Sequence, residues 1–120
     1  MANQTRVHKI SERIRSILAM HLLRLSDPRF QMVTITGVRV TTDLRLAKVY
    51  WGVTGGKEKI KLVEDGFESA KGILRRELAL ELGIKFVPEL KFYYDDTLDI
   101  IDETQALMKK VAEIEKKTES

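Results

Sequence analysis

The chain has 120 residues, of which 43% are hydrophobic and 32% charged, so it holds enough apolar material for one globular domain but is short for two. It has no cysteine, which excludes disulfides, thiol nucleophiles and thiolate metal sites. The net charge is only +3, but residues 1–62 carry 12 Lys and Arg against 4 Asp and Glu, whereas residues 63–120 carry 9 against 14. This uneven distribution of charge suits a polyanionic partner, and ordinary surface charge explains it about equally well.

Residues 4–25 are predicted to form an amphipathic helix, because apolar side chains recur every three or four residues and Asp27-Pro28 then ends the pattern. A basic stripe beside the apolar one consists of Arg6, Lys9 and Arg13, which a solvated face explains more simply than a binding surface. The start of the chain is charged, unlike a signal peptide, and no apolar run approaches the roughly 18 residues of a membrane span. A cytoplasmic protein is therefore expected.

Residues 30–42 and 44–53 are predicted to pair as a β-hairpin. Both segments are rich in β-branched residues, apolar and polar positions alternate, and a short polar turn at Asp43 separates them. The apolar parity of the first segment switches at Gly37, which indicates a β-bulge.

Residues 60–82 carry a second apolar stripe at helical spacing, and Gly72 stands in the middle of it. Glycine in a helix interior costs about 0.5–1 kcal/mol relative to alanine, so the sequence predicts a helix that is kinked or broken at this point. Gly83 is a natural C-terminal stop.

The remaining segments complete an α+β fold. After Pro88 comes a third strand with Leu90, Phe92 and Tyr94 on one side, and residues 97–115 form a final helix. We expect the apolar side chains of this helix to face inward, namely Leu98, Ile101, Met108, Val111 and Ile114. The sequence thus predicts one domain over residues 1–115, with helices on one face of a three-stranded sheet, and a flexible tail over residues 116–120.

Catalysis has no candidate residues in this sequence. The two histidines, His8 and His21, point about 140° apart on their helix and cannot share a metal ion. "DDTLD" at residues 95–99 matches a diphosphate-Mg²⁺ pattern, but capping of the final helix by Asp96 or Thr97 explains the same residues better. No serine has a nucleophile context and no phosphate-binding loop is present, so neither an enzyme nor a cofactor is expected.

Several aromatic residues lie on the predicted strands, where stacking platforms for single-stranded bases are sometimes built. They are Tyr50, Trp51, Phe92, Tyr93 and Tyr94. Core packing is the simpler role for Phe92 and Tyr94.

The predicted order of elements is that of a type II KH domain, in which a Gly-x-x-Gly loop between two helices clamps a nucleic-acid backbone. The Gly-x-x-Gly of this chain, Gly52 to Gly55, ends a strand instead and is interpreted as chance. At the helix junction stands Ala70-Lys71-Gly72, and here the chain resembles the bacterial ribosome-binding factor A family, KH-like proteins with a kink at an Ala-x-Gly motif. Further matching blocks are "DPRF" (27–30), "VTITGVRVTTDL" (33–44), "AKVY" (47–50), "LRREL" (74–78) and "VPELKFYYDDTL" (87–98).

The resemblance implies a non-enzymatic assembly factor. Such a protein binds the small (30S) ribosomal subunit and its RNA, acts late in maturation near the processing of the 16S RNA 5′ end, and supports growth in the cold. It also implies a monomer without a cofactor, no membrane partner, and ribosomal proteins and assembly GTPases as further partners.

The resemblance also implies an RNA-contacting track, in which cations and N–H groups freed at the helix junction meet phosphates. Its candidate residues are Arg29, Arg39, Arg45, Lys48, Ala70, Lys71, Gly72, Arg75 and Arg76. A competing interpretation is that Glu68 and Lys71 merely pair on a solvated face.

A second function class also stays open, namely a KH-like module that binds mainly a protein partner through its hairpin and final helix. Salt should weaken RNA binding more steeply than it weakens such a protein contact.

Overall fold

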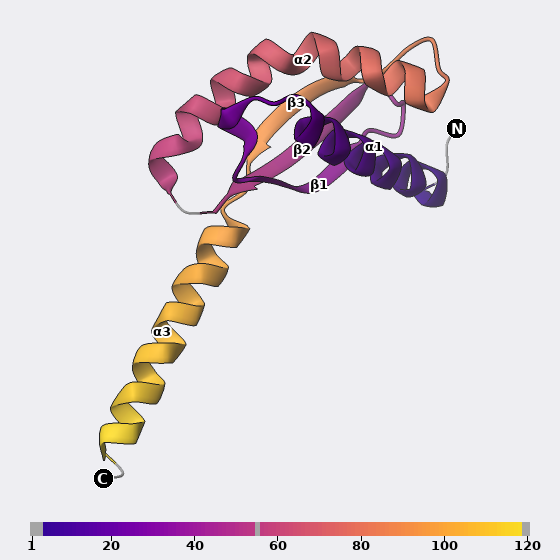
Figure 1. Cartoon of the computed structure of the whole chain (residues 1–120). Helices are drawn as coiled ribbons and strands as arrows, with labels where there is room; N and C mark the ends of the chain where they lie inside the picture. The colour runs from indigo at the N-terminus through magenta and orange to yellow at the C-terminus, as the bar shows by residue number, and fades with distance from the viewer. Residues whose placement is uncertain (1–3, 55, 119–120) are drawn as a thin grey trace.

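The computed structural model describes residues 4–54 and 56–118, so Gly55 of the Gly-x-x-Gly match lies outside the described residues (Figure 1). The elements follow in the order α1 (Gln4–Arg24), a 3-10 turn η1 (Pro28–Phe30), β1 (Val33–Val40), β2 (Leu46–Val53), η2 (Lys57–Lys59), α2 (Ile60–Leu82), β3 (Glu89–Tyr94) and α3 (Thr97–Thr118). The predicted α+β class and element order are confirmed.

The sheet has the strand order β1-β2-β3. The predicted hairpin of β1 and β2 is antiparallel, and its register shifts between Ile35 and Gly37, which confirms the bulge. β3 runs parallel to β2, so the chain must cross over between them, and α2 makes this crossover.

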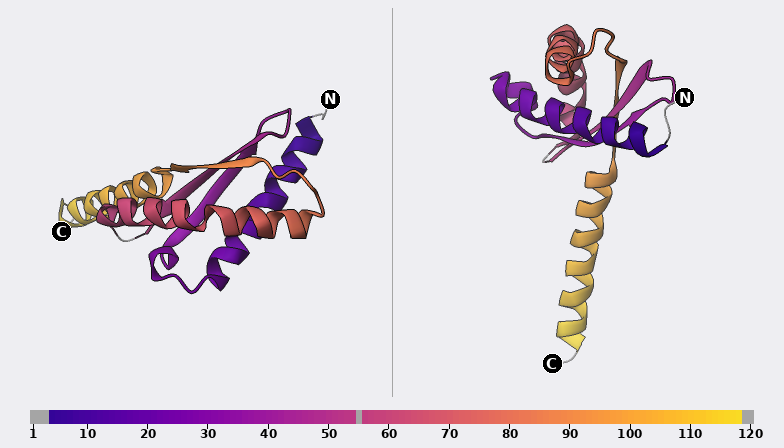
Figure 2. Two further views of the ribbon diagram at one scale, coloured as in Figure 1. Left: turned by 90° about the horizontal axis from the view of Figure 1, so that it is seen from above. Right: turned by 90° about the vertical axis from the view of Figure 1, so that its right-hand side faces the viewer.

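One face of the sheet carries the core. α1 and α2 lie against this face (Figure 2), and their buried residues pack on Trp51, Val49 and Leu90 of the strands. The ring of Phe67 on α2 is 1% exposed and lies at the centre, with ring centroids 4.3 Å from Phe92 and 5.4 Å from Trp51. Phe92 and Tyr94 pack against the core, as predicted.

α2 is continuous from Ile60 to Leu82, so the prediction of two helices meeting at Gly72 is wrong. Figure 1 shows it arching over the sheet as a single helix, the common curvature of a helix that wraps a core. Burial of Ala70, Leu74 and Leu78 on its inner side outweighs the propensity cost of one glycine, since a buried leucine alone contributes about 1.5–3 kcal/mol.

α3 does not pack on the sheet, and the inward orientation predicted for its apolar side chains is wrong (Figure 1, Figure 2). Every side chain from 103 to 117 is exposed, and Ile101 and Met108 are 44% and 66% exposed. The core face is already covered by α1 and α2, which leaves α3 no place on it. The side chain of Leu98 lies outside the described residues, as do residues 119–120, and the boundary between domain and tail stays a prediction.

Asp95 joins β3 to α3. Its carboxylate accepts hydrogen bonds from Thr36 Oγ1 at 2.7 Å and from the backbone N–H of Thr97 at 2.9 Å, and its own N–H donates to the Trp51 carbonyl. The side-chain hydrogen bonds of Thr97 and Thr36 hold the pKa of Asp95 below its ordinary value. The side chain that accepts hydrogen bonds at the start of α3 is therefore that of Asp95, and not that of Asp96 or Thr97, the two predicted caps.

Candidate nucleic-acid interface

An open groove runs between α2 and the edge strand β3. Its floor is the stacked pair Phe67 and Phe92, whose ring planes are 12° apart. The polar side chains along it are Glu64, Glu68, Lys71, Lys91 and Tyr93. Acidic residues thus occupy the N-terminal part of the α2 wall and a cation follows them toward the C-terminus.

Lys71 and Arg75 lie on the side of α2 that faces β3, because residues four apart share a helix face. The guanidinium Nη2 of Arg75 donates to the carbonyl of Val87 at 3.1 Å, which ties α2 to the segment that leads into β3. Arg76 follows Arg75 by about 100° around the helix and points away from the groove. The three cations predicted to act together are therefore divided between two sides of α2.

Two further residues of the predicted track do not fit their assigned contacts. Ala70 is 7% exposed and belongs to the core, so its side chain is not available to RNA. Gly72 is exposed, but the helix is unbroken there, so the expected free N–H groups are paired within α2 and provide no anion site. The correction follows from the continuity of the helix.

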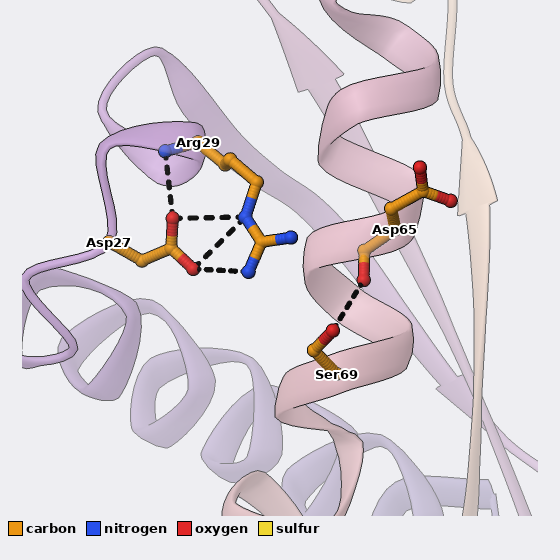
Figure 3. Close-up of polar contacts among 4 residues, drawn as sticks. All are labelled: Asp27, Arg29, Asp65 and Ser69. Carbon is orange, nitrogen blue, oxygen red and sulfur yellow. Dashed lines mark hydrogen bonds and ion pairs between the residues drawn. The ribbon is translucent and has the colours of Figure 1, made fainter.

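Arg29 is engaged in an ion pair with Asp27 (Figure 3). Arg29 Nη2 lies 2.7 Å from Asp27 Oδ2, and the Nε and backbone N–H of Arg29 also donate to this carboxylate. The side-chain hydrogen bond between them lowers the pKa of Asp27 and raises that of Arg29. The guanidinium points toward α2, where Ser69 Oγ donates to the Asp65 carbonyl at 3.0 Å. Arg29 thus holds η1 in place and is not part of the groove.

Arg39, Arg45 and Lys48 lie elsewhere again. Arg39 and Lys48 are register partners on β1 and β2, on the face of the sheet opposite the core. Arg45 lies in the connecting turn, where its N–H donates to Asp43 Oδ1. These cations do not extend the groove along α2.

Sequence reasoning missed Lys91 as a site residue. The alternation in "ELKFYY" carried the necessary signal, because Leu90, Phe92 and Tyr94 point to the core and Lys91 and Tyr93 must point the other way.

Among residues 4–54 and 56–118, no three His, Asp or Glu side chains are grouped as a metal site. None of the described helices is both long and apolar enough to cross a bilayer.

Comparison with known proteins decides the family. The model of the family described as "Ribosome-binding factor A" matches residues 6–108. The chain belongs to the ribosome-binding factor A family. One relative, the ribosome-binding factor A of Citrifermentans bemidjiense, is 42% identical over 107 residues, which are 88% of this chain and 90% of the relative. The family is one of ribosome-binding factors and is not a known family of enzymes.

Solved structures of the family share this fold, which is KH-like. A Thermotoga maritima protein, determined by solution NMR, aligns with a TM-score of 0.69 at 32% identity, over 78% of this chain and 90% of that one. A homology model of the Thermus thermophilus ribosome-binding factor A, fitted into a cryo-EM map of a 30S complex, aligns with a TM-score of 0.63 over 75% of this chain and 94% of that one. At its 23% identity the second comparison shows the fold alone.

Proposed function

We propose that this protein is a non-enzymatic assembly factor that binds the free 30S ribosomal subunit. The family match over residues 6–108 carries the proposal, and the Thermus thermophilus protein fitted with its 30S subunit supports it. In this proposal residues 1–115 form an RNA-binding domain that acts as a cytoplasmic monomer. It acts late in maturation of the 16S RNA, near the processing of the 5′ end, and supports growth in the cold.

The groove between α2 and β3 is the surface we assign to ribosomal RNA. Lys71 forms no ion pair with Glu68 or with any other described residue, so its charge is available to a phosphate. Lys91 lines the same groove from β3. Glu64 and Glu68 repel phosphates from the other end of the groove and so orient the strand.

We expect the protein to co-sediment with free small subunits and not with translating ribosomes, since an assembly factor acts before the subunit is complete. Sucrose-gradient fractionation of a cell extract, followed by immunoblotting of each fraction, measures this. Equal association with polysomes would contradict the proposed role.

Replacement of Lys71 by alanine is expected to weaken 30S binding and to reduce the slope of log affinity against log salt by about one unit, because one phosphate contact is lost. Arg76→Ala is the matched control, since it removes one cation from the next turn of the same helix but outside the groove. Equilibrium binding to purified 30S subunits at several salt concentrations measures both variants. Equal losses for the two variants would remove the groove from the proposal and leave a general effect of charge.

A second candidate function is a module that binds mainly a protein partner. The observation in its favour is the exposed apolar side chains of α3, which none of the residues described in the structure covers. They include Ile100, Leu107, Met108, Val111 and Ile114. Subunit affinity that hardly changes between low and high salt, and that falls on Leu107→Glu but not on Lys71→Ala, would favour this candidate over RNA contact.

A further inference from the structure

The face of the sheet opposite α1 and α2 carries three cations in one row. Arg39 on β1 is the register partner of Lys48 on β2, and Lys48 is the register partner of Lys91 on β3. Partners in register point to the same face, and adjacent strands lie about 4.8 Å apart. The three residues therefore form one row across the whole width of the sheet.

This arrangement is unfavourable in the isolated protein. Like charges directly opposite each other on neighbouring strands destabilise a sheet, whereas a pair of opposite charges stabilises it. Within the described part of the chain, none of the three cations forms an ion pair. A polyanion lying along the row would supply the missing negative charge.

The next row along the strands is aromatic. The rings of Tyr50 and Tyr93 are stacked, with centroids 5.7 Å apart and planes 29° apart, and Tyr93 is 41% exposed. On β1 the register partner of Tyr50 is Gly37, which has no side chain, and an open hollow lies beside the ring. Gly37, Arg39 and Tyr50 line this hollow together with the carboxylates of Glu12, Asp95 and Asp96. The tyrosine rings therefore lie next to the row of cations and are accessible from solvent.

Acidic residues on β3 and just after it mark both limits of this surface. Glu89 precedes Lys91 by two positions and Asp95 follows Tyr93 by two, so both belong to the same alternation. The Asp95 carboxylate is held there by Thr36 and Thr97. An anionic strand would therefore cross the sheet from β1 to β3, between the two carboxylates, rather than run along the strands.

We propose that this helix-free face binds a single-stranded RNA segment, with phosphates along Arg39, Lys48 and Lys91 and bases stacked on Tyr50 and Tyr93. Cations beside exposed aromatic rings are the chemistry that recognises unpaired nucleotides, because only unstacked bases offer a free face to a side chain. A duplex would satisfy the cations but not the rings. The inference rests on the proposed function in that ribosomal RNA supplies the strand. It adds a second surface, which shares Lys91 and Tyr93 with the groove at the β3 edge of the sheet.

The test is fluorescence anisotropy of the full-length protein with a labelled uridine 12-mer and with a blunt RNA duplex of the same length. We expect the single strand to bind at least tenfold more tightly than the duplex. The double variant Tyr50→Leu/Tyr93→Leu, which keeps apolar bulk but removes the aromatic rings, should lose about tenfold or more in single-strand affinity. Lys48→Gln should reduce the salt slope by about 0.7 units, the value for one phosphate of a single strand.

Arg76→Gln, outside this face, is the control for charge, and circular dichroism of each variant confirms that it is folded. Equal affinity for single strand and duplex, or unchanged affinity of the folded tyrosine variant, would overturn the inference. Binding of the unmodified protein to 30S subunits is measured in parallel. Subunit binding without binding of the single strand would overturn only this inference, whereas binding of the single strand without subunit binding would overturn only the proposed function.

Discussion

Replacement of Phe67 by alanine is expected to lower the free energy of unfolding by about 3–5 kcal/mol. Phe67 is buried, and its ring contacts aromatic side chains from three other elements: Phe30 of η1 at 5.0 Å, Trp51 of β2 at 5.4 Å and Phe92 of β3 at 4.3 Å between ring centroids. Truncation therefore leaves a cavity at the point where these elements meet α2. Urea denaturation monitored by circular dichroism measures the loss.

The alanine variant loses a large share of the roughly 5–15 kcal/mol that stabilises a typical domain, so the milder variant Phe67→Leu is measured beside it. Leucine fills more of the site and should cost less than alanine. Tyr93→Ala serves as the control, since it truncates an aromatic residue on the helix-free face of the same sheet, where Tyr93 is 41% exposed. A loss for Phe67→Ala no larger than that for Tyr93→Ala would contradict the central role of Phe67.

Gly66→Ala and Gly72→Ala are expected to change stability in opposite directions, although both place alanine in the interior of α2. At Gly66 a new Cβ would lie 3.0 Å from Phe30 Cζ and 3.3 Å from Arg29 Nε, so the side chains of Phe30 and Arg29 must give way by a few tenths of an ångström. At Gly72 the new Cβ would have no neighbour within 4 Å. We expect Gly72→Ala to add about 0.4–1 kcal/mol, and Gly66→Ala to be the less stable of the two by about 1–3 kcal/mol.

The helix propensity gained is the same in both variants, so their difference measures the contact of Gly66 with Phe30. Chemical denaturation of both proteins under the same conditions gives this difference directly. Equal stabilisation by the two substitutions would show that Phe30 moves aside without cost and that the close packing of η1 on α2 is not required.

The elements of the fold could be predicted from the sequence because each has a clear period. The alternation of β1 even located the bulge, since the switch of apolar parity at Gly37 requires one extra residue. The break at Gly72 was a wrong prediction because a propensity cost below about 1 kcal/mol competes with burial of Leu74 and Leu78, which is worth more. Local preference yielded to packing at this position.

The packing of α3 could not be predicted for a different reason. An apolar stripe such as Ile101, Met108 and Val111 shows that one side of a helix avoids water, but it does not say whether the same chain covers that side. The candidate site was limited in a similar way. Cations that follow one another in sequence, such as Arg75 and Arg76, point in different directions, whereas Lys48 and Lys91 become neighbours only through the parallel pairing of β2 and β3.

The separation of α3 from the core has a consequence for hydrogen exchange. This 22-residue helix contacts β2 near its start, and an exposed ion pair joins Lys57 Nζ to Glu103 Oε1 at 3.6 Å, but its side chains from 103 to 117 are exposed. A helix without tertiary packing is only marginally stable in water, so its amide protons should exchange by local opening that does not require the sheet to unfold. The amides of β2, in contrast, should exchange only through global unfolding. Phe67→Ala would then accelerate exchange in β2 and leave exchange in α3 unchanged. The chain would therefore contain two units, the domain core and α3, that open independently of each other.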